Sequence, residues 1–268
     1  MIRLTREVRF SVDRDWAGHV AFARPITNSW GGWPSAVGIV PYLTLRGTLA
    51  GTPDATTGYL CNVHAIDDLL RRQAIPHTAE ALKRHGWRFS AERLLGDLWR
   101  SVEPAAPPST TLVEIELWAT PCLRYAIRRE VSTMVFMTQQ FEFSAAHRLH
   151  CPELDDEKNR EIFGKCNNPA GHGHNYLLEV TVLGEPDPRT GALLPLPKFE
   201  QLVKERVIDR FDHKHLNEDT EEFRELNPSI ENIARVIWQA LLGTVSPARL
   251  SKVRVWETPK TYAEYSED

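Results

Sequence analysis

Hydrophobic and polar residues alternate along several stretches of the chain, which is the pattern of half-buried β-strands. In the second half, alternating stretches rich in Val, Phe, Tyr and Thr predict strands at residues 135–147, 175–184, 250–257 and 261–265. Apolar residues at helical spacing predict helices at residues 198–211 and 229–242. Ile230 and Ile237 lie on one face of the second helix, and Ser229 is suited to cap its N-terminus.

Short segments of the first half of the chain match segments of the second half in the same order. The clearest match joins residues 48–54 to residues 181–187, and a Thr-Gly pair follows both. Such internal repetition indicates a duplicated domain. We therefore expect tandem domains of the α+β class at residues 1–130 and 131–268. Each is expected to be a four-stranded antiparallel sheet with two helices on one face.

Composition and charge argue against several classes of function. The chain has 268 residues, of which 42% are hydrophobic and 25% charged, as is typical of folded domains. The formal net charge is −4 and no block of Lys and Arg stands out, so we expect no nucleic-acid partner. No apolar run approaches the roughly 18–20 residues of a membrane span, and the polar start does not resemble a signal peptide. The cysteines form no Cys-x-x-Cys pair, which favours a reducing, cytoplasmic location.

Three histidines are placed to bind one metal ion. His172 and His174 stand two residues apart at the start of a predicted strand, so their side chains point to the same face. His147 ends the preceding strand, on the face shared by Phe143 and Ala145. If these strands pair, the three imidazoles meet at one end of the sheet. Three histidines with an open fourth position form a typical catalytic zinc site.

Other polar residues of the second half suggest acid–base chemistry and ligand binding. Cys166 lies in a polar loop, and a thiol beside a metal and basic groups can move protons. Asp212 and His213 follow the first helix as an adjacent carboxylate and imidazole, which can pass a proton. Glu257 shares a strand face with apolar residues and needs hydrogen-bond donors, which a pterin or guanine edge would supply. Spacing alone does not separate these roles from those of a structural cysteine and solvent-exposed polar side chains.

Taken together, these motifs resemble the 6-pyruvoyl-tetrahydropterin synthase family. The resemblance covers about residues 135–266 and rests on residues 143–148, 163–176, 212–217, 231–234 and 255–258. It implies the tunnelling fold, a zinc ion, and a dihydropterin substrate with a triphosphorylated side chain. It also implies that His147, His172 and His174 bind the zinc ion. By the same resemblance, Cys166 transfers protons with Asp212 and His213 as its relay. Glu257 would anchor the pterin ring, and Ser229 and Glu231 would make further contacts in the pocket.

The reaction that this resemblance implies converts 7,8-dihydroneopterin triphosphate to 6-pyruvoyl-tetrahydropterin. Triphosphate is eliminated and an internal redox shift occurs without nicotinamide. The same family contains the 6-carboxy-tetrahydropterin synthase of the queuosine pathway, whose cysteine usually stands closer to the His-x-His pair. The longer loop from Cys166 to His172 resembles the pyruvoyl enzymes. Ile230 and residues 194–197 depart from the family pattern, so a carboxy product and a non-catalytic pterin-binding module are the alternatives.

The first half of the chain keeps the order of strands and helices but lacks the histidines, the cysteine and the glutamate of the second half. The positions that match the three histidines, Cys166 and Glu257 hold, in that order, Arg14, Ile39, Pro41, Trp33 and Ala119. These side chains offer no zinc ligand, so residues 1–130 are expected to form a non-catalytic domain.

The resemblance also implies an assembly. The family closes three sheets into a barrel and stacks two barrels. A chain with two sheets is therefore expected to form a homotrimer, or a multiple of trimers, because an exposed sheet face and edges must be covered. The expected site is shared between chains, with Cys166 of one chain meeting Asp212 and His213 of the next.

Overall fold

The protein is described here by a computed structural model that covers residues 1–14, 20–21 and 42–266. The chain divides into two compact units. The N-terminal unit comprises Met1–Met137 and Gly184–Leu193, and the C-terminal unit comprises Thr138–Leu183 and Leu194–Asp268. The loop Gly184–Leu193 thus packs with the N-terminal unit, although it lies inside the second expected domain.

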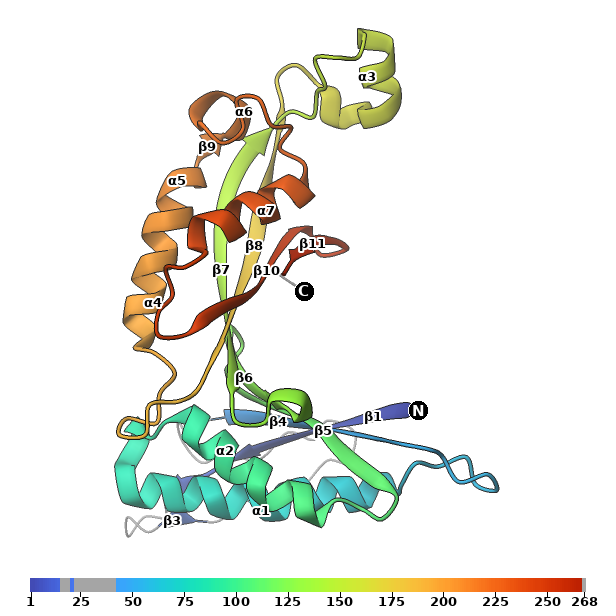
Figure 1. Ribbon diagram of the computed structural model, residues 1–268, viewed down its shortest axis with the longest axis vertical. Coiled ribbons are helices and arrows are strands. Elements are labelled where there is room, and N and C mark those ends of the chain that lie inside the picture. Colours follow the sequence, from blue (N-terminus) through green and yellow to red (C-terminus); the bar gives the residue numbers. More distant parts are fainter. Residues whose placement is uncertain (15–19, 22–41, 267–268) are drawn as a thin grey trace. The chain divides into compact units, whose positions relative to one another are not determined.

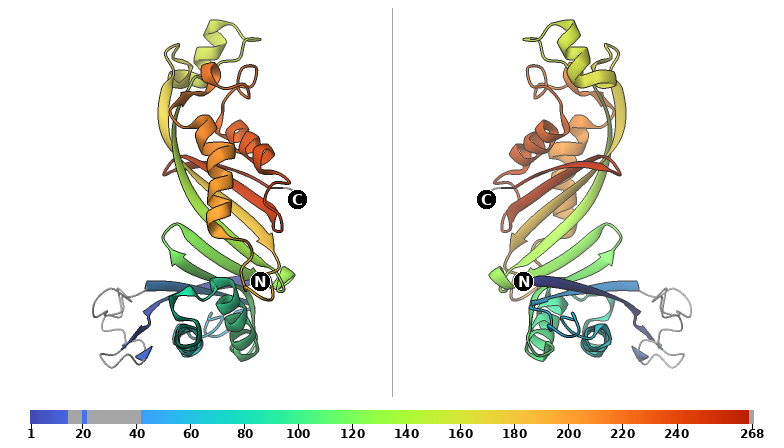
Figure 2. Two further views of the ribbon diagram at one scale, coloured as in Figure 1. Left: turned by 90° about the vertical axis from the view of Figure 1, so that its left-hand side faces the viewer. Right: turned by 90° about the vertical axis from the view of Figure 1, so that its right-hand side faces the viewer.

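The N-terminal unit contains an antiparallel sheet with two helices on one face (Figures 1 and 2). The sheet order is β1-β4-β5-β6. In helix α2, Leu94, Leu98 and Val102 are buried at helical spacing, so the helix presents one apolar stripe to the sheet. The elements of this unit are β1 (Ile2–Ser11), β2 (Asp13–Arg14), β3 (Val20–Ala21), β4 (Tyr42–Gly51), α1 (Val63–His85), α2 (Ala91–Val102), β5 (Thr110–Thr120) and β6 (Leu123–Arg128).

The C-terminal unit repeats this kind of layer, with the sheet order β7-β8-β10-β11. The short strand β9 pairs in parallel with the end of β7. Helices α4, α5 and α7 lie on the same side of the curved sheet (Figure 2). The elements of this unit are β7 (Val135–His147), α3 (Asp156–Phe163), β8 (His172–Gly184), α4 (Leu196–Val203), α5 (Asp209–Phe211), β9 (Lys214–His215), α6 (Leu216–Asp219), α7 (Ile230–Leu241), β10 (Arg249–Thr258) and β11 (Thr261–Tyr265).

Helix α7 supplies much of the apolar layer in the C-terminal unit. Ile233, Ile237 and Leu241 are at most 1% exposed and recur at helical spacing. The Ser229 hydroxyl accepts a hydrogen bond from the backbone N–H of Asn232, which confirms the expected N-cap. Helix α7 is therefore capped at Ser229, one of the residues expected to contact a ligand.

The two units share a local feature at a constant separation along the chain. The hydroxyls of Thr5 and Thr48 are hydrogen-bonded at 2.8 Å on the paired strands β1 and β4. Those of Thr138 and Thr181 are hydrogen-bonded at 2.9 Å on the neighbouring strands β7 and β8. Each residue of the second pair lies 133 positions after its counterpart, since 138 − 5 and 181 − 48 are equal.

The loops that follow β4 and β8 also fold alike. The Oδ1 atoms of Asp54 and Asp187 each accept hydrogen bonds from the backbone N–H groups two and three residues later. The second loop is fixed to α2, because the buried carboxylate of Glu92 accepts a 3.0 Å hydrogen bond from the backbone N–H of Leu193. This contact explains why the loop belongs to the N-terminal unit.

Some details differ from the sequence expectations. The helix expected at residues 198–211 begins at Leu196, and a π-helical turn at Lys204–Ile208 separates α4 from α5. Helix α3 was not expected, because it is short, mostly charged and lacks a clear apolar stripe. Trp33, Ile39 and Pro41 lie outside the described residues.

The part of the chain that the structure describes contains no helix that is both long and apolar enough to cross a membrane.

Candidate functional site

A cluster of three histidines lies where β7 ends and β8 begins (Figure 1). Gly171 makes the turn into β8 with a φ of +69°, a value that favours glycine. A Cβ atom at Gly171 would lie 2.6 Å from His215 Nε2 and 3.0 Å from the carbonyl oxygen of His147. The close approach of the two strand ends therefore depends on this glycine.

The ligand atoms of His147, His172 and His174 lie within 4.8 Å of one another. His147 Nε2 and His172 Nε2 are 3.1 Å apart, close to the separation of about 3.3 Å for two nitrogens on one tetrahedral zinc ion. His174 Nε2 is buried and has no hydrogen-bond partner among the described residues. A shared cation would satisfy these converging nitrogen atoms, so the residues fit a metal site.

The tautomer of His147 is set by its surroundings. Its Nδ1 lies 2.7 Å from the carbonyl oxygen of Pro228, which can only accept a hydrogen bond, so Nδ1 carries the proton. Nε2 then presents a lone pair to the cluster, as in metal sites whose histidines are oriented by a backbone carbonyl. The pKa of His147 is lowered from 6.5 to about 4. Burial is the main cause, the Pro228 hydrogen bond opposes it, and the neighbouring histidines act in the same direction as burial. His147 is therefore neutral near pH 7, the form that binds metal ions.

Glu257, at the end of β10, borders the histidine cluster. Its Oε1 atom lies 3.5 Å from Nε2 of both His147 and His174. The carboxylate is about 20% exposed, so one side remains open to a ligand. Sequence reasoning placed Glu257 on the apolar face of its strand, and the structure adds that this face leads to the histidines.

Tyr176 is a residue of the site that sequence reasoning missed. It is 0% exposed, and its ring centroid lies 5.6 Å from that of His174 and 6.2 Å from that of His147. Its hydroxyl is buried without a hydrogen-bond partner among the described residues. The available signal was strand alternation, because His172, His174 and Tyr176 stand at every second position of β8.

Cys166 lies in a half-buried 3₁₀ turn, Gly164–Asn167, just before β8. Its carbonyl oxygen accepts a 2.9 Å hydrogen bond from the backbone N–H of Leu149, which ties the turn to the segment after β7. Burial is the main cause that raises the pKa of Tyr176, Glu257 is the second cause, and the Cys166 thiol is the third.

Asp212 and His213 follow α5 and form the expected pair, with His213 Nδ1 2.8 Å from Asp212 Oδ2. The other oxygen, Asp212 Oδ1, accepts a 2.8 Å hydrogen bond from the backbone N–H of Ser144. This bond, and then the hydrogen bond from His213, lowers the pKa of Asp212. The His213 side chain is 83% exposed, and no hydrogen bond or ion pair joins the pair to Cys166 among the described residues.

The remaining two candidate residues lie at the start of α7. Ser229 directly follows Pro228, whose carbonyl oxygen holds His147, so the helix N-terminus is adjacent to the cluster. Glu231 is exposed in the first turn of α7. No hydrogen bond connects Glu231 to the histidines within the described chain.

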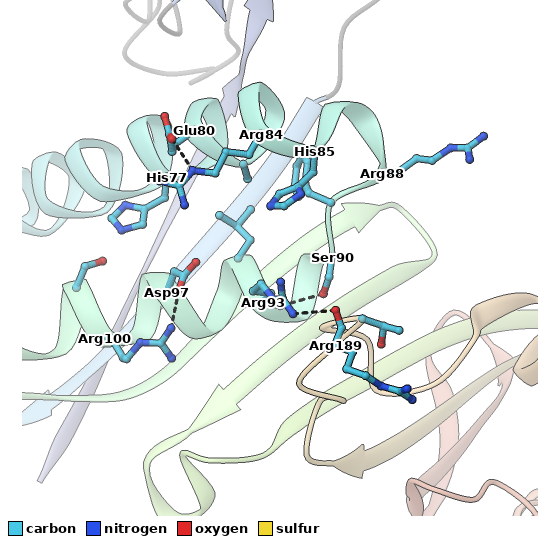
Figure 3. Close-up of a pocket in the computed structure, with 15 residues that line it drawn as sticks. His77, Glu80, Arg84, His85, Arg88, Ser90, Arg93, Asp97, Arg100 and Arg189 are labelled. Carbon is cyan, nitrogen blue, oxygen red and sulfur yellow. Dashed lines mark hydrogen bonds and ion pairs between the residues drawn. The ribbon is translucent and has the colours of Figure 1, made fainter.

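The N-terminal unit has a hollow of about 700 Å³ between α1, α2 and the loop after β8 (Figure 3). Several of its basic side chains already have partners: Arg84 pairs with Glu80 at 2.6 Å, and Arg100 pairs with Asp97. Arg93 donates hydrogen bonds to backbone carbonyl oxygens of the loop. Among the described residues, the histidine cluster of the C-terminal unit is the one group of metal-binding side chains found.

The similarity to known proteins covers the part of the chain that carries this site. The model of the 6-pyruvoyl tetrahydropterin synthase family matches residues 136–268. A 6-pyruvoyl tetrahydrobiopterin synthase of Drosophila melanogaster is 43% identical over 133 residues, which are 49% of this chain and 79% of that protein. The chain belongs to the 6-pyruvoyl tetrahydropterin synthase family. All the candidate site residues lie within the segment that the family model matches.

Two further proteins show the range of the similarity. A 6-carboxy-5,6,7,8-tetrahydropterin synthase of Haemophilus influenzae is 27% identical over 154 residues, covering 50% of this chain and 100% of that protein. The solved structure of the Caenorhabditis elegans 6-pyruvoyl tetrahydropterin synthase is 41% identical, with a TM-score of 0.48, and covers 50% of this chain and 96% of that one.

Proposed function

We propose that the C-terminal unit is a zinc-dependent lyase that converts 7,8-dihydroneopterin triphosphate to 6-pyruvoyl-tetrahydropterin with loss of triphosphate. The observation that carries this proposal is the histidine cluster inside the family segment, with His147 held in its metal-binding tautomer by Pro228. His147, His172 and His174 would hold the ion. A bound zinc ion would supply Lewis acidity toward the oxygens of the substrate side chain and make the neighbouring C–H bonds more acidic.

The other residues of the chain would bind the substrate and move its protons. Glu257 presents a partly exposed carboxylate beside the cluster, which suits the N–H groups along one edge of a pterin. Cys166 is the proposed proton-transferring thiol, with Asp212 and His213 as its relay. Ser229 and Glu231 are proposed pocket contacts at the start of α7. The low pKa of Asp212 keeps its carboxylate charged, so it can stabilise a protonated His213.

We also propose that the chain is a tandem duplication whose N-terminal copy, residues 1–130, is non-catalytic. The paired threonines 133 positions apart and the matching loops support the duplication. The catalytic copy, residues 131–268, would act within a homotrimer or a multiple of trimers. In support, His213 is exposed, and no hydrogen bond or ion pair joins it or Asp212 to Cys166 among the described residues, which suits a site shared between subunits.

The proposal is tested by incubating zinc-loaded protein with 7,8-dihydroneopterin triphosphate and identifying the products by mass. Release of triphosphate with a 6-pyruvoyl-tetrahydropterin product is expected, and the Cys166→Ala protein serves as the matched control. A 6-carboxy-tetrahydropterin product would instead favour the queuosine-pathway activity. Substrate that binds and is recovered unchanged would contradict catalysis and favour a pterin-binding module.

A further inference from the structure

The buried hydroxyl of Tyr176 calls for a physical explanation. A phenol hydroxyl removed from water without a hydrogen-bond partner destabilises a fold, and a phenylalanine would fill the same space without that loss. The ring itself is tightly held, because it stacks on Phe143 with centroids 5.0 Å apart and planes 17° apart. Packing therefore accounts for an aromatic ring at this position and leaves the hydroxyl unexplained.

The carboxylate of Glu257 is the charged group that suits this hydroxyl. On the paired strands β8 and β10, Leu178 lies opposite Val255 and Leu177 lies opposite Trp256, so Tyr176 and Glu257 come next on the two strands. His174 lies close to both, because its ring centroid is 5.6 Å from that of Tyr176 and its Nε2 is 3.5 Å from Glu257 Oε1. The phenol O–H is a donor and the carboxylate is an acceptor. Hydrogen bonds from a neutral donor to a carboxylate are among the stronger ones in proteins.

The present contacts of Glu257 are incompatible with a loaded histidine cluster. Its Oε1 atom lies 3.5 Å from Nε2 of His147 and of His174. Those two nitrogens are the ones that would face a metal ion, so neither could then donate to the carboxylate. Glu257 would need another donor on its buried side. Tyr176 is next to it in the strand register, and its buried hydroxyl has no hydrogen-bond partner among the described residues.

The N-terminal unit has no counterpart of Tyr176 or of Glu257. The threonine pairs set a separation of 133 positions along the chain, so Leu43 is the equivalent of Tyr176 and Phe10 is the equivalent of Phe143. Phe10 and Leu43 face each other on β1 and β4 and are 1% and 8% exposed. The position that matches Glu257 holds Ala119. The apolar packing is thus kept in both units, and the hydroxyl occurs only where the carboxylate occurs.

We propose that Tyr176 is a positioning residue whose hydroxyl donates a hydrogen bond to Glu257 and orients that carboxylate toward the pterin. This inference rests on the proposed function, because it assigns Glu257 to pterin binding. Tyr176 acts on substrate affinity through Glu257, and it neither holds the metal nor transfers a proton.

The test compares Tyr176→Phe, Glu257→Gln and the double variant in the zinc-loaded protein. Binding of 7,8-dihydroneopterin is measured by fluorescence titration, and KM and kcat are measured with the triphosphate. Tyr176→Phe should weaken binding about 10-fold and raise KM similarly with a smaller change in kcat, since one hydrogen bond to a charged group is lost. Zinc content and Tm should not fall. The double variant should bind no more weakly than Glu257→Gln, because coupled residues do not act additively.

The control is Tyr125→Phe, a buried tyrosine of β6 in the N-terminal unit, which should change neither binding nor KM. Wild-type-like binding by Tyr176→Phe, or additive losses in the double variant, would overturn the inference. Loss of zinc in Tyr176→Phe would also overturn it, because the hydroxyl would then serve the metal site. If the wild-type protein binds no dihydropterin, the proposed function itself fails, and that outcome is visible before any variant is compared.

Discussion

The stability of the metal-free protein should fall as the pH drops below neutrality, because of His147. The pKa of this histidine is lowered from 6.5 to about 4, first by burial. A histidine with a lowered pKa binds its proton more readily in the unfolded chain, so acid favours unfolding. Its contribution is fully present above pH 6.5 and is lost as the pH falls toward about 4. At about 1.4 kcal/mol per pKa unit, the loss approaches about 3 kcal/mol.

The measurement is urea unfolding of metal-free protein at several pH values from about 7.5 to about 4.5. Carboxylates also titrate in this range, so the relevant quantity is the difference between wild type and His147→Phe. This difference should shrink by about 2.5 kcal/mol across the series. His64→Gln, an exposed position at the start of α1, should follow the wild type. A pH-independent difference between wild type and His147→Phe would refute the assignment of a buried, neutral His147.

Three further predictions concern catalysis, assembly and folding. Cys166→Ala should retain zinc and lose about 10²–10⁴-fold in turnover, while Cys122→Ala should be nearly silent, as steady-state assays would show. Mixed oligomers of Cys166→Ala and His213→Ala chains should recover activity that neither variant has alone, and mixtures as inactive as the single variants would argue against shared sites. Ile237→Ala should lower the free energy of unfolding by about 2–5 kcal/mol, because it removes a fully buried side chain of α7, whereas the exposed Leu242→Ala should have little effect on urea unfolding.

Much of the site follows from strand alternation. His172 and His174 were expected on one face because they stand two residues apart, and the structure brings them to His147 at the strand ends. The same alternation extends to Tyr176, which the sequence offered no reason to separate from the apolar core. An unpartnered hydroxyl is a property of three-dimensional packing, so it appeared only in the structure.

Other features depend on contacts between distant segments and could not be predicted. The Pro228 carbonyl that orients His147 comes from a loop 81 positions away. The loop after β8 packs with the N-terminal unit because Glu92 binds the backbone of Leu193, 101 positions away. Helix α3 escaped detection because a short charged helix has no apolar period to reveal it.

Metal analysis of the purified protein is the sharpest test of a zinc site confined to the C-terminal unit. One equivalent of zinc per chain is expected, held by the histidine cluster of this unit, and almost none is expected in His174→Ala, because two imidazoles bind zinc weakly. About two equivalents per chain would contradict the claim that one unit alone carries the site. No zinc in the wild-type protein after incubation with the ion, or full zinc content in His174→Ala, would contradict the site itself.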